Sequence, residues 1–244
     1  MKRSIYLVVI GVITLICAAV GVYMHNFSDE EWGWGDKQVS YINETLDEIH
    51  SLDVVSNMMQ LTVKAGDNYA IDCKYSEGYE PTYRLENGKL TIEQNNKVKW
   101  SMRNCTCEVV VTIPKNKTLE KMSIAADVGD VRIQDITCGT FDYEGDVANV
   151  DVENVVLNTV NAQSDVGDIE FNRCQFEQMT VKNDVGDVEV ESSKDLTDYQ
   201  MQLTADLGDV EVNGKEQGKE YKNENRSDKK LNISVATGDV DVHY

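Results

Sequence analysis

The sequence predicts an all-β fold: a single-domain β-solenoid made of stacked coils of short strands, preceded by an N-terminal transmembrane helix. Three observations predict it. A five-residue phrase recurs about every 20 residues in the second half of the chain, and apolar residues alternate on both sides of it. An uncharged apolar run of about 20 residues stands near the N-terminus. Two prolines and 16 glycines agree with a β-rich chain.

Residues 1–24 predict a membrane anchor. Lys2 and Arg3 precede an uncharged run over residues 5–24, which is long enough to span a bilayer and longer than the core of most signal peptides. The two basic residues favour a cytoplasmic N-terminus. We therefore expect a single-pass protein of the cell membrane with its C-terminal domain outside the cytoplasm. A cleaved signal peptide is the alternative.

Residues 25–45 predict a juxtamembrane linker. Trp32 and Trp34 either lie at the membrane interface or pack on the first coil. Residues 41–50 either form a short helix or begin the first strand. From residue 46 to residue 244 we expect one solenoid domain, with lead-in strands over 46–115 and repeats over 116–244.

The lead-in contains three strand-like runs, at 61–63, 90–92 and 109–113. Asn87-Gly88 precedes the second run and is a strong signal for a tight β-hairpin. Pro114 follows the third run, where a strand would end because proline cannot donate to the sheet.

The phrase of the repeat region is Asp-x-Gly-Asp followed by Val or Ile. It stands at 127–131, 165–169, 184–188 and 206–210, with a weaker copy at 236–240 and a degenerate copy at Gly145-Asp146-Val147. The glycine predicts a tight corner, where it supplies a positive φ that other residues resist. The polar stretch 213–230 separates the last two copies, and we expect it to loop out.

Apolar residues are in register around each glycine. Five and seven residues before it stand Ile124/Met122, Ala162/Val160, Val181/Met179, Leu203/Met201 and Ile233/Leu231. After it come Val131/Ile133, Ile169/Phe171, Val188/Val190, Val210/Val212 and Val240/Val242. Residues two apart lie on one face of a strand. Each repeat therefore predicts a strand, a corner and a strand, and stacking buries the apolar face.

The aspartates of the phrase are candidate calcium ligands. We call Asp127, Asp165, Asp184 and Asp206 the first aspartates, and Asp130, Asp168, Asp187 and Asp209 the second aspartates. Stacked coils would place these carboxylates in acidic columns with a spacing of about 4.8 Å, and calcium prefers six to eight oxygen ligands. The alternative is that each second aspartate caps the backbone amides of its own turn and the column is solvated.

The charge of the chain excludes some classes of partner. After the N-terminal segment, 21 basic residues stand against 43 acidic residues, a net charge of −22. Such a polyanion is unsuited to nucleic acid or to anionic lipid headgroups. Divalent cations, basic proteins and cationic polymers are compatible with it.

The sequence predicts no enzyme. His25, His50 and His243 stand apart from any triad or metalloprotease motif, and a solvated carboxylate column does not separate two pKa values as a catalytic pair requires. Beyond the apolar run lie Cys73, Cys105, Cys107, Cys138 and Cys174. Their spacing is unlike a zinc site, and we expect buried thiols that act as small apolar residues.

The order of these features resembles a known family. Ala65-Gly66-Asp67, then Glu86-Asn87-Gly88-Lys89-Leu90-Thr91-Ile92, then 110–115 (Val-Val-Thr-Ile-Pro-Lys) and the Gly-Asp-Val repeats are similar to the bacterial putative-adhesin domain, domain-of-unknown-function family 4097, also called toastrack. The resemblance covers residues 46–244. It implies a β-solenoid, commonly held outside the membrane by one helix, with no accepted catalytic residues or cofactor. This chain departs from it by having aspartate where relatives often have Ser or Thr before the Gly-Asp corner.

These observations favour a non-enzymatic binding, adhesin-like or structural module of the cell envelope, with a cell-wall polymer or an envelope protein as partner. One alternative is an accessory ectodomain of an envelope-stress system that acts through a partner membrane protein. A second alternative is a calcium-binding surface scaffold.

Overall fold

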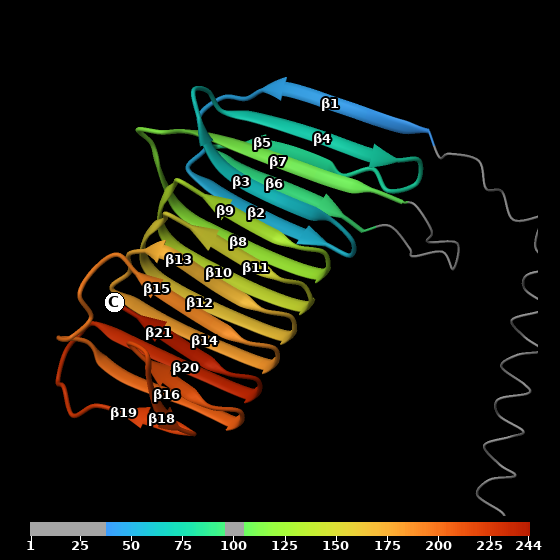
Figure 1. The fold of residues 1–244 in the computed structure, drawn as a ribbon. Helices are drawn as coiled ribbons and strands as arrows, with labels where there is room; N and C mark the ends of the chain where they lie inside the picture. The colour runs from blue at the N-terminus through green and yellow to red at the C-terminus, as the bar shows by residue number, and fades with distance from the viewer. Residues whose placement is uncertain (1–37, 96–104) are drawn as a thin grey trace, which may run out of the picture. The chain divides into compact units, whose positions relative to one another are not determined.

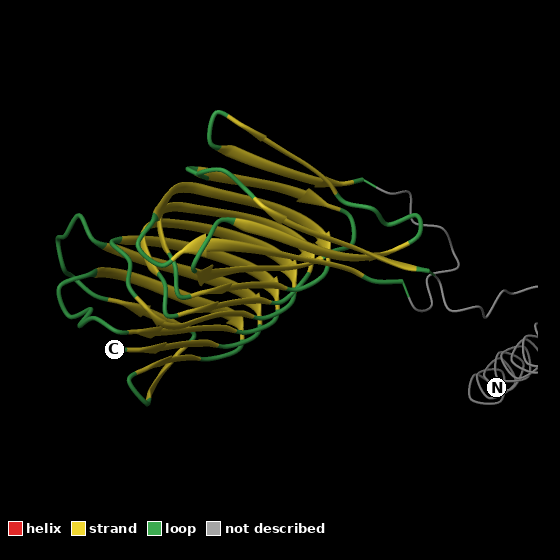
Figure 2. Ribbon diagram, turned by 90° about the horizontal axis from the view of Figure 1, so that it is seen from above, coloured by secondary structure: helices red, strands yellow, loops and turns green. Residues whose placement is uncertain are grey.

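The computed structural model describes residues 38–95 and 105–244. These residues form two long sheets packed face to face, with strands joined into successive coils (Figures 1 and 2). Every element in this part of the chain is a β-strand, which confirms the all-β solenoid. No helix in the described ranges is long and apolar enough to cross a membrane. The segment 1–24, expected to be the anchor, lies outside these residues, as do Trp32 and Trp34.

Sheet A has 11 strands and sheet B has 10 in the described part of the chain. In spatial order sheet A consists of β1 (Val39–Thr45), β4 (Ala70–Ser76), β7 (Cys107–Pro114), β3 (Gln60–Gly66), β9 (Val131–Gln134), β11 (Val150–Glu153), β13 (Ile169–Cys174), β15 (Val188–Ser192), β21 (Val240–His243), β17 (Val210–Val212) and β18 (Lys215–Gly218). Sheet B consists of β19 (Glu220–Lys222), β16 (Gln200–Leu207), β20 (Lys230–Thr237), β14 (Gln178–Val185), β12 (Val156–Val166), β10 (Thr137–Val147), β8 (Thr118–Val128), β2 (Ser51–Ser56), β6 (Lys89–Gln94) and β5 (Thr82–Glu86).

Each coil of the repeat region contributes one strand to each sheet. β8, β10, β12 and β14 pair in parallel, with Val128, Val147, Val166 and Val185 side by side. The coil period here is therefore 19 residues, in agreement with the expected spacing of about 20. The apolar positions predicted around each glycine are buried between the sheets. Gln38–Tyr244 form one compact unit with this core at its centre.

The degenerate copy is centred three residues later than predicted. Gly145 lies inside β10, paired with Ser164, and faces the interior. The corner of this coil holds Ala148 in the glycine position, with Asn149 in place of the second aspartate, because the amide of Ala148 donates to the next coil as the corner glycines do. Gly145 is a glycine for a different reason: a Cβ there would lie 2.0 Å from the hydroxyl oxygen of Tyr143.

The order of coils in the stack differs from their order in the chain at both ends (Figure 1). The last coil of the chain, β20–β21, lies between β14–β15 and β16–β17. In the same way β2–β3 lies between β6–β7 and β8–β9. The repeat pattern could not predict these insertions, because every coil offers equivalent strand edges to its neighbours.

Antiparallel strands form both ends of the stack. Residues 213–230, expected to loop out, instead contain β18 and β19, which pair with β17 and β16. At the other end β5 pairs with β6, while β4 and β1 extend sheet A beyond β7. The last strand of a sheet has one side open to water, and charged residues are common there. A polar segment such as 213–230 can therefore form strands at this end of the stack.

The lead-in strands are confirmed by β3, β6 and β7, the last of which ends at Pro114. Asn87 and Gly88 have φ of 51° and 77°, as a tight hairpin turn between β5 and β6 requires. The sheet begins earlier than residue 46, since β1 occupies part of the expected linker. Residues 41–45 are strand and not helix, because Ile42 packs on the core while Tyr41 and Asn43 face solvent.

Candidate functional site

The corners between sheet B and sheet A form one edge of the stack. Gly129, Gly167, Gly186 and Gly238 have φ between 124° and 141°, which confirms the positive φ predicted for them. The same prediction is wrong for Gly208, whose φ lies outside this range. A Cβ on Gly167 would lie 2.1 Å from the carbonyl oxygen of Ala148 in the neighbouring coil. Glycine is therefore required both by the backbone conformation and by the close approach of the coils.

The second aspartates link one coil to the next. The Oδ1 of Asp168 accepts a hydrogen bond from the amide of Asp187 at 2.9 Å, and that of Asp187 accepts from Asp239 at 2.8 Å. Asp239 in turn accepts from the amide of Asp209 at 2.8 Å, and Asn149 accepts from Asp168 at 3.0 Å. The alternative stated above, that each second aspartate caps the amides of its own turn, is wrong for these residues, because the acceptor reaches the amide of the adjacent coil.

The first aspartates have no such role. Asp127, Asp165 and Asp184 are exposed. Asp146 is exposed too, and it takes the position of a first aspartate in the coil whose corner lies at Ala148. The strand register puts these four on successive coils, and Ala236 then separates them from Asp206. Within the described residues no hydrogen bond reaches their carboxylates. Like charges in adjacent strands repel, so this row lowers the stability of the fold. Its carboxylates form no hydrogen bond with the described residues that would offset the repulsion.

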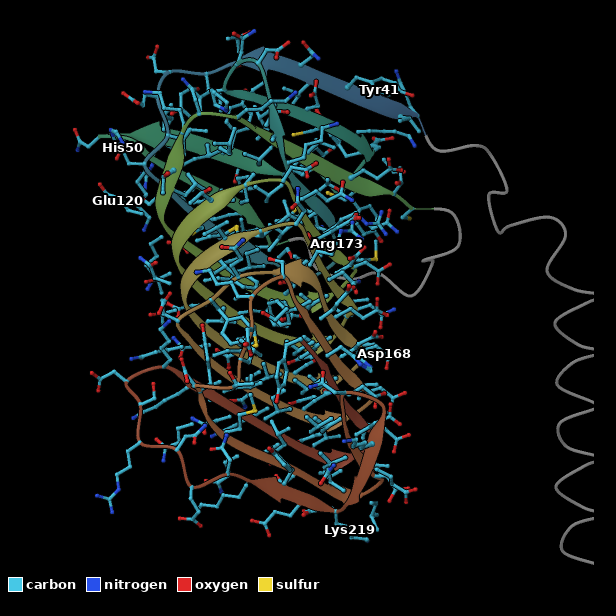
Figure 3. All side chains as sticks on the ribbon, turned by 60° about the vertical axis from the view of Figure 1, so that its left-hand side comes forward. Tyr41, His50, Glu120, Asp168, Arg173 and Lys219 are labelled. Atoms are coloured by element: carbon cyan, nitrogen blue, oxygen red, sulfur yellow. The ribbon has the colours of Figure 1, made fainter. Side chains whose placement is uncertain are left out.

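An apolar ridge runs between the two rows. It consists of the residue before each corner position, and the side chains are 42–67% exposed: Val128, Val147, Val166, Val185 and Leu207. Thr237 takes this position in the inserted coil. We call the ridge together with the first and second aspartates, Asp146 and Asn149 the corner face. Figure 3 shows Asp168 at this edge of the stack.

A further acidic column crosses the outer face of sheet A. Five carboxylates occupy paired positions in adjacent strands: Asp151, Glu170, Glu189, Asp241 and Glu211. Arg132 forms an ion pair with Asp151 at one end, at 3.0 Å. Burial, and then the charge of Glu211, raises the pKa of Asp241, with His243 opposing the shift. These five acidic residues are thus in register across adjacent strands.

An open cavity of about 430 Å³ lies on the outer face of sheet B. Its polar lining includes Asp142, Asn161, Gln163, Thr180 and Lys182. Asp142 accepts a hydrogen bond from Asn161 at 2.8 Å and pairs with Lys121 at 2.7 Å. Burial acts to raise the pKa of Asp142, but these two partners outweigh it and hold the pKa below its ordinary value. This carboxyl is therefore ionised and held in place.

The sequence matches a family model, Toastrack DUF4097, over residues 49–243. The chain belongs to the DUF4097 toastrack family. A "putative cell adhesion protein" from Clostridium sporogenes shares the fold, with 15% identity and a TM-score of 0.51 over 84% of this chain and 99% of its own. A "putative adhesin" from Bacteroides fragilis, 14% identical, has a TM-score of 0.52 over 84% of this chain and 97% of its own. No match was found among curated proteins.

The described toastrack residues contain no group of three or more His, Cys, Asp or Glu side chains arranged to hold a metal ion. One oxygen of Asp168 and of Asp187 is already used between coils. The first aspartates are exposed, and their carboxylates accept no hydrogen bond from the described residues. Calcium binding therefore stays a prediction, and the first aspartates are the better candidates for it.

Four toastrack cysteines are buried thiols: Cys73, Cys107, Cys138 and Cys174. Burial raises the pKa of Cys107 and Cys138 to about 12, and that of Cys73 and Cys174 to about 11. Such thiols are neutral at physiological pH and pack as small apolar side chains. Cys105 is half-buried.

Proposed function

We propose that this chain is a non-enzymatic, membrane-anchored binding module of the bacterial cell envelope, adhesin-like in action. Its N-terminus lies in the cytoplasm, residues 5–24 span the membrane, and the coils lie outside. The corner face carries the proposal. Acidic side chains recur there on successive coils around an exposed apolar ridge, although the first aspartates contribute no bond to the stack.

The corner face suits a basic partner with some apolar surface. The rows of first and second aspartates attract cations, and the ridge of Val128, Val147, Val166 and Val185 adds apolar area. A basic envelope protein or a cationic cell-wall polymer has this chemistry. The names of the two solved structures, an adhesin and a cell adhesion protein, support a binding role.

The pKa shifts of the carboxyl groups favour binding over catalysis. A hydrolytic carboxyl pair needs one acid whose pKa is raised in a cleft. In the sheet B cavity the pKa of Asp142 is shifted the other way, and Lys121 neutralises its charge. Asp241 has a raised pKa, but it lies in the acidic column on the outer face of sheet A.

The test uses residues 38–244, which form a compact unit, and isolated cell envelopes. We expect the fragment to sediment with cell-wall material or to crosslink to an envelope protein. Changing Asp127, Asp146, Asp165 and Asp184 to Asn should weaken binding at least tenfold. The matched control, Asp67→Asn with Glu77, Glu93 and Glu120 changed to Gln, removes the same charge elsewhere and should bind normally. A folded, monodisperse fragment without affinity for either fraction would contradict the proposal.

The membrane topology needs its own experiment. Protease should digest the coils of the full chain when it is added to intact cells without an outer membrane or cell wall. A reporter fused before Met1 should remain protected. Protected coils would refute the extracytoplasmic placement.

A further inference from the structure

Among the described residues, strand β1 ends sheet A with one side unpaired (Figure 1). On its paired side, the carbonyl of Gln38 accepts from the amide of Glu77, and the amide of Leu46 donates to Tyr69. Antiparallel strands alternate between residues that bond to a given neighbour and residues that point away from it. Since residues 38 and 46 bond toward the sheet, the even residues between them do the same. The odd residues direct N–H and C=O to the open side: Val39, Tyr41, Asn43 and Thr45.

This edge lacks the usual protection. Four strands end the two sheets in the described part of the chain, and β1 has seven residues against five, four and three for β5, β18 and β19. β5 follows Pro81, and β18 contains Lys215 and Gly218, whereas β1 has no Pro, Gly, Lys or Arg. Tyr41 is 72% exposed on it (Figure 3) and Val39 is 37% exposed.

The residues of β1 are self-complementary about Ile42. In a two-fold antiparallel pair centred there, Tyr41 faces Asn43 of the second copy, and Val39 faces Thr45. Glu44, the one charged residue of the strand, faces Ser40. Ile42 meets its own copy, an apolar contact. No like charges are opposed, although the chain as a whole carries a net charge of −20.

We propose that two copies of this chain associate through β1, joining their A sheets into one continuous sheet. The open hydrogen-bonding groups of the odd residues supply the bonds. A second copy is the fitting occupant because the strand pairs with itself without a charge conflict. This association is independent of the proposed function of the corner face.

The first test measures the mass of residues 38–244 by analytical ultracentrifugation over a range of concentrations. A concentration-dependent dimer is expected. Tyr41→Pro removes an outward N–H without touching the bonds to β4 and should abolish the dimer. A monomer at every concentration, or a dimer that survives Tyr41→Pro, overturns the proposal.

Charge pairs test the register. Val39→Glu with Thr45→Glu opposes two pairs of like charges and should raise the dimer Kd about 2- to 30-fold. Val39→Lys with Thr45→Glu should lower it. Val39→Lys with Thr45→Lys should also raise Kd, although it reduces the net negative charge. If this Lys variant instead tightens the dimer, association follows net charge and the register is wrong.

The full chain provides a second test in isolated membranes. Ile42→Cys places two thiols opposite each other, within the Cα separation that a disulfide spans. Mild oxidation should crosslink this variant to a dimer. Asn43→Cys, whose copies lie diagonally and too far apart, and the unchanged chain serve as controls. Equal crosslinking in all three overturns the proposed pairing.

Discussion

The backbone N–H of Asp187 donates to Oδ1 of Asp168 at 2.9 Å, so a side chain of one coil holds the corner of the next. The bond recurs between Asp239 and Asp187 and between Asp209 and Asp239. Asn149 fills the same position and accepts from Asp168, which shows that the bond needs a side-chain oxygen and not a charge. The two aspartates of one phrase thus differ in their roles.

Asp168→Ala should lower the free energy of unfolding by about 0.5–1.5 kcal/mol, because the amide of Asp187 loses its acceptor. Asp168→Asn should stay close to the unchanged chain, since Asn149 already works in this position. Asp165→Ala removes a repelling charge that accepts no bond and should change stability by less than about 0.5 kcal/mol. Urea unfolding measures all three. Equal losses for Asp165→Ala and Asp168→Ala would contradict the division of roles.

Gly167→Ala should destabilise the stack by about 2 kcal/mol or more. The added Cβ would sit 2.1 Å from the carbonyl oxygen of Ala148, and φ is 136°. Gly214→Ala is the matched control, because φ there is 72° but no atom lies within 4 Å of the added Cβ. It should cost only the strain of a left-handed residue, about 1 kcal/mol. Equal costs in thermal unfolding would show that coil contact does not constrain the corner.

Asp241→Asn should stabilise the domain at neutral pH. Burial and Glu211 raise the pKa of Asp241, so the folded state disfavours the charged form. The penalty is absent at a pH below the ordinary pKa and grows as the pH rises through the raised pKa. Melting temperatures of the variant and the unchanged chain should therefore converge in acid and separate toward pH 7.

Asp195→Asn provides a control of opposite sign. The backbone amide of Thr197 lowers the pKa of Asp195, so its contribution is present above the ordinary pKa and is lost as the pH falls. This variant should be less stable than the unchanged chain at pH 7. A melting curve of Asp241→Asn that lies below the unchanged chain at pH 7 would refute the sign assigned to Asp241.

Calcium binding should appear as a higher melting temperature in about 5 mM calcium than in chelator, since a ligand of the folded state stabilises it. Changing Asp127, Asp146, Asp165 and Asp184 to Asn should remove the increase. The variant with Asp67→Asn and Gln at 77, 93 and 120 should keep it. A melting temperature that calcium does not alter would exclude a calcium site on the corner face.

Much of the coil was predictable because its signals are local. Gly167 with its flanking Val166 and Ile169 predicts a corner between two strands, and burial of Ala162 and Phe171 follows from alternation. The coil with Ala148 was misplaced, because a glycine three residues earlier, Gly145, imitates the signal. Gly145 is required instead because a side chain there would collide with Tyr143. These two residues lie on one face of the same strand, and an alignment of the repeats does not reveal such a contact.

The candidate site was predictable in part. The exposure of the first aspartates follows from the strand period, whereas the bond between Asp168 and Asp187 depends on how closely two coils stack. The apolar ridge was missed because Val147 and Val166 resemble core valines in sequence, and only the corner turns them toward solvent.

By itself the sequence determined that this chain is a β-solenoid with glycine corners, a buried apolar interior and an acidic surface, because strand period and glycine conformation are local properties. The tertiary structure alone decided the order of the coils, the insertion of β20–β21, the antiparallel strands at both ends and the open edge of β1. Identical coils can stack in several orders with nearly the same local energy. The choice among them rests on contacts between residues as distant as Val181 and Ile233, which no local pattern encodes.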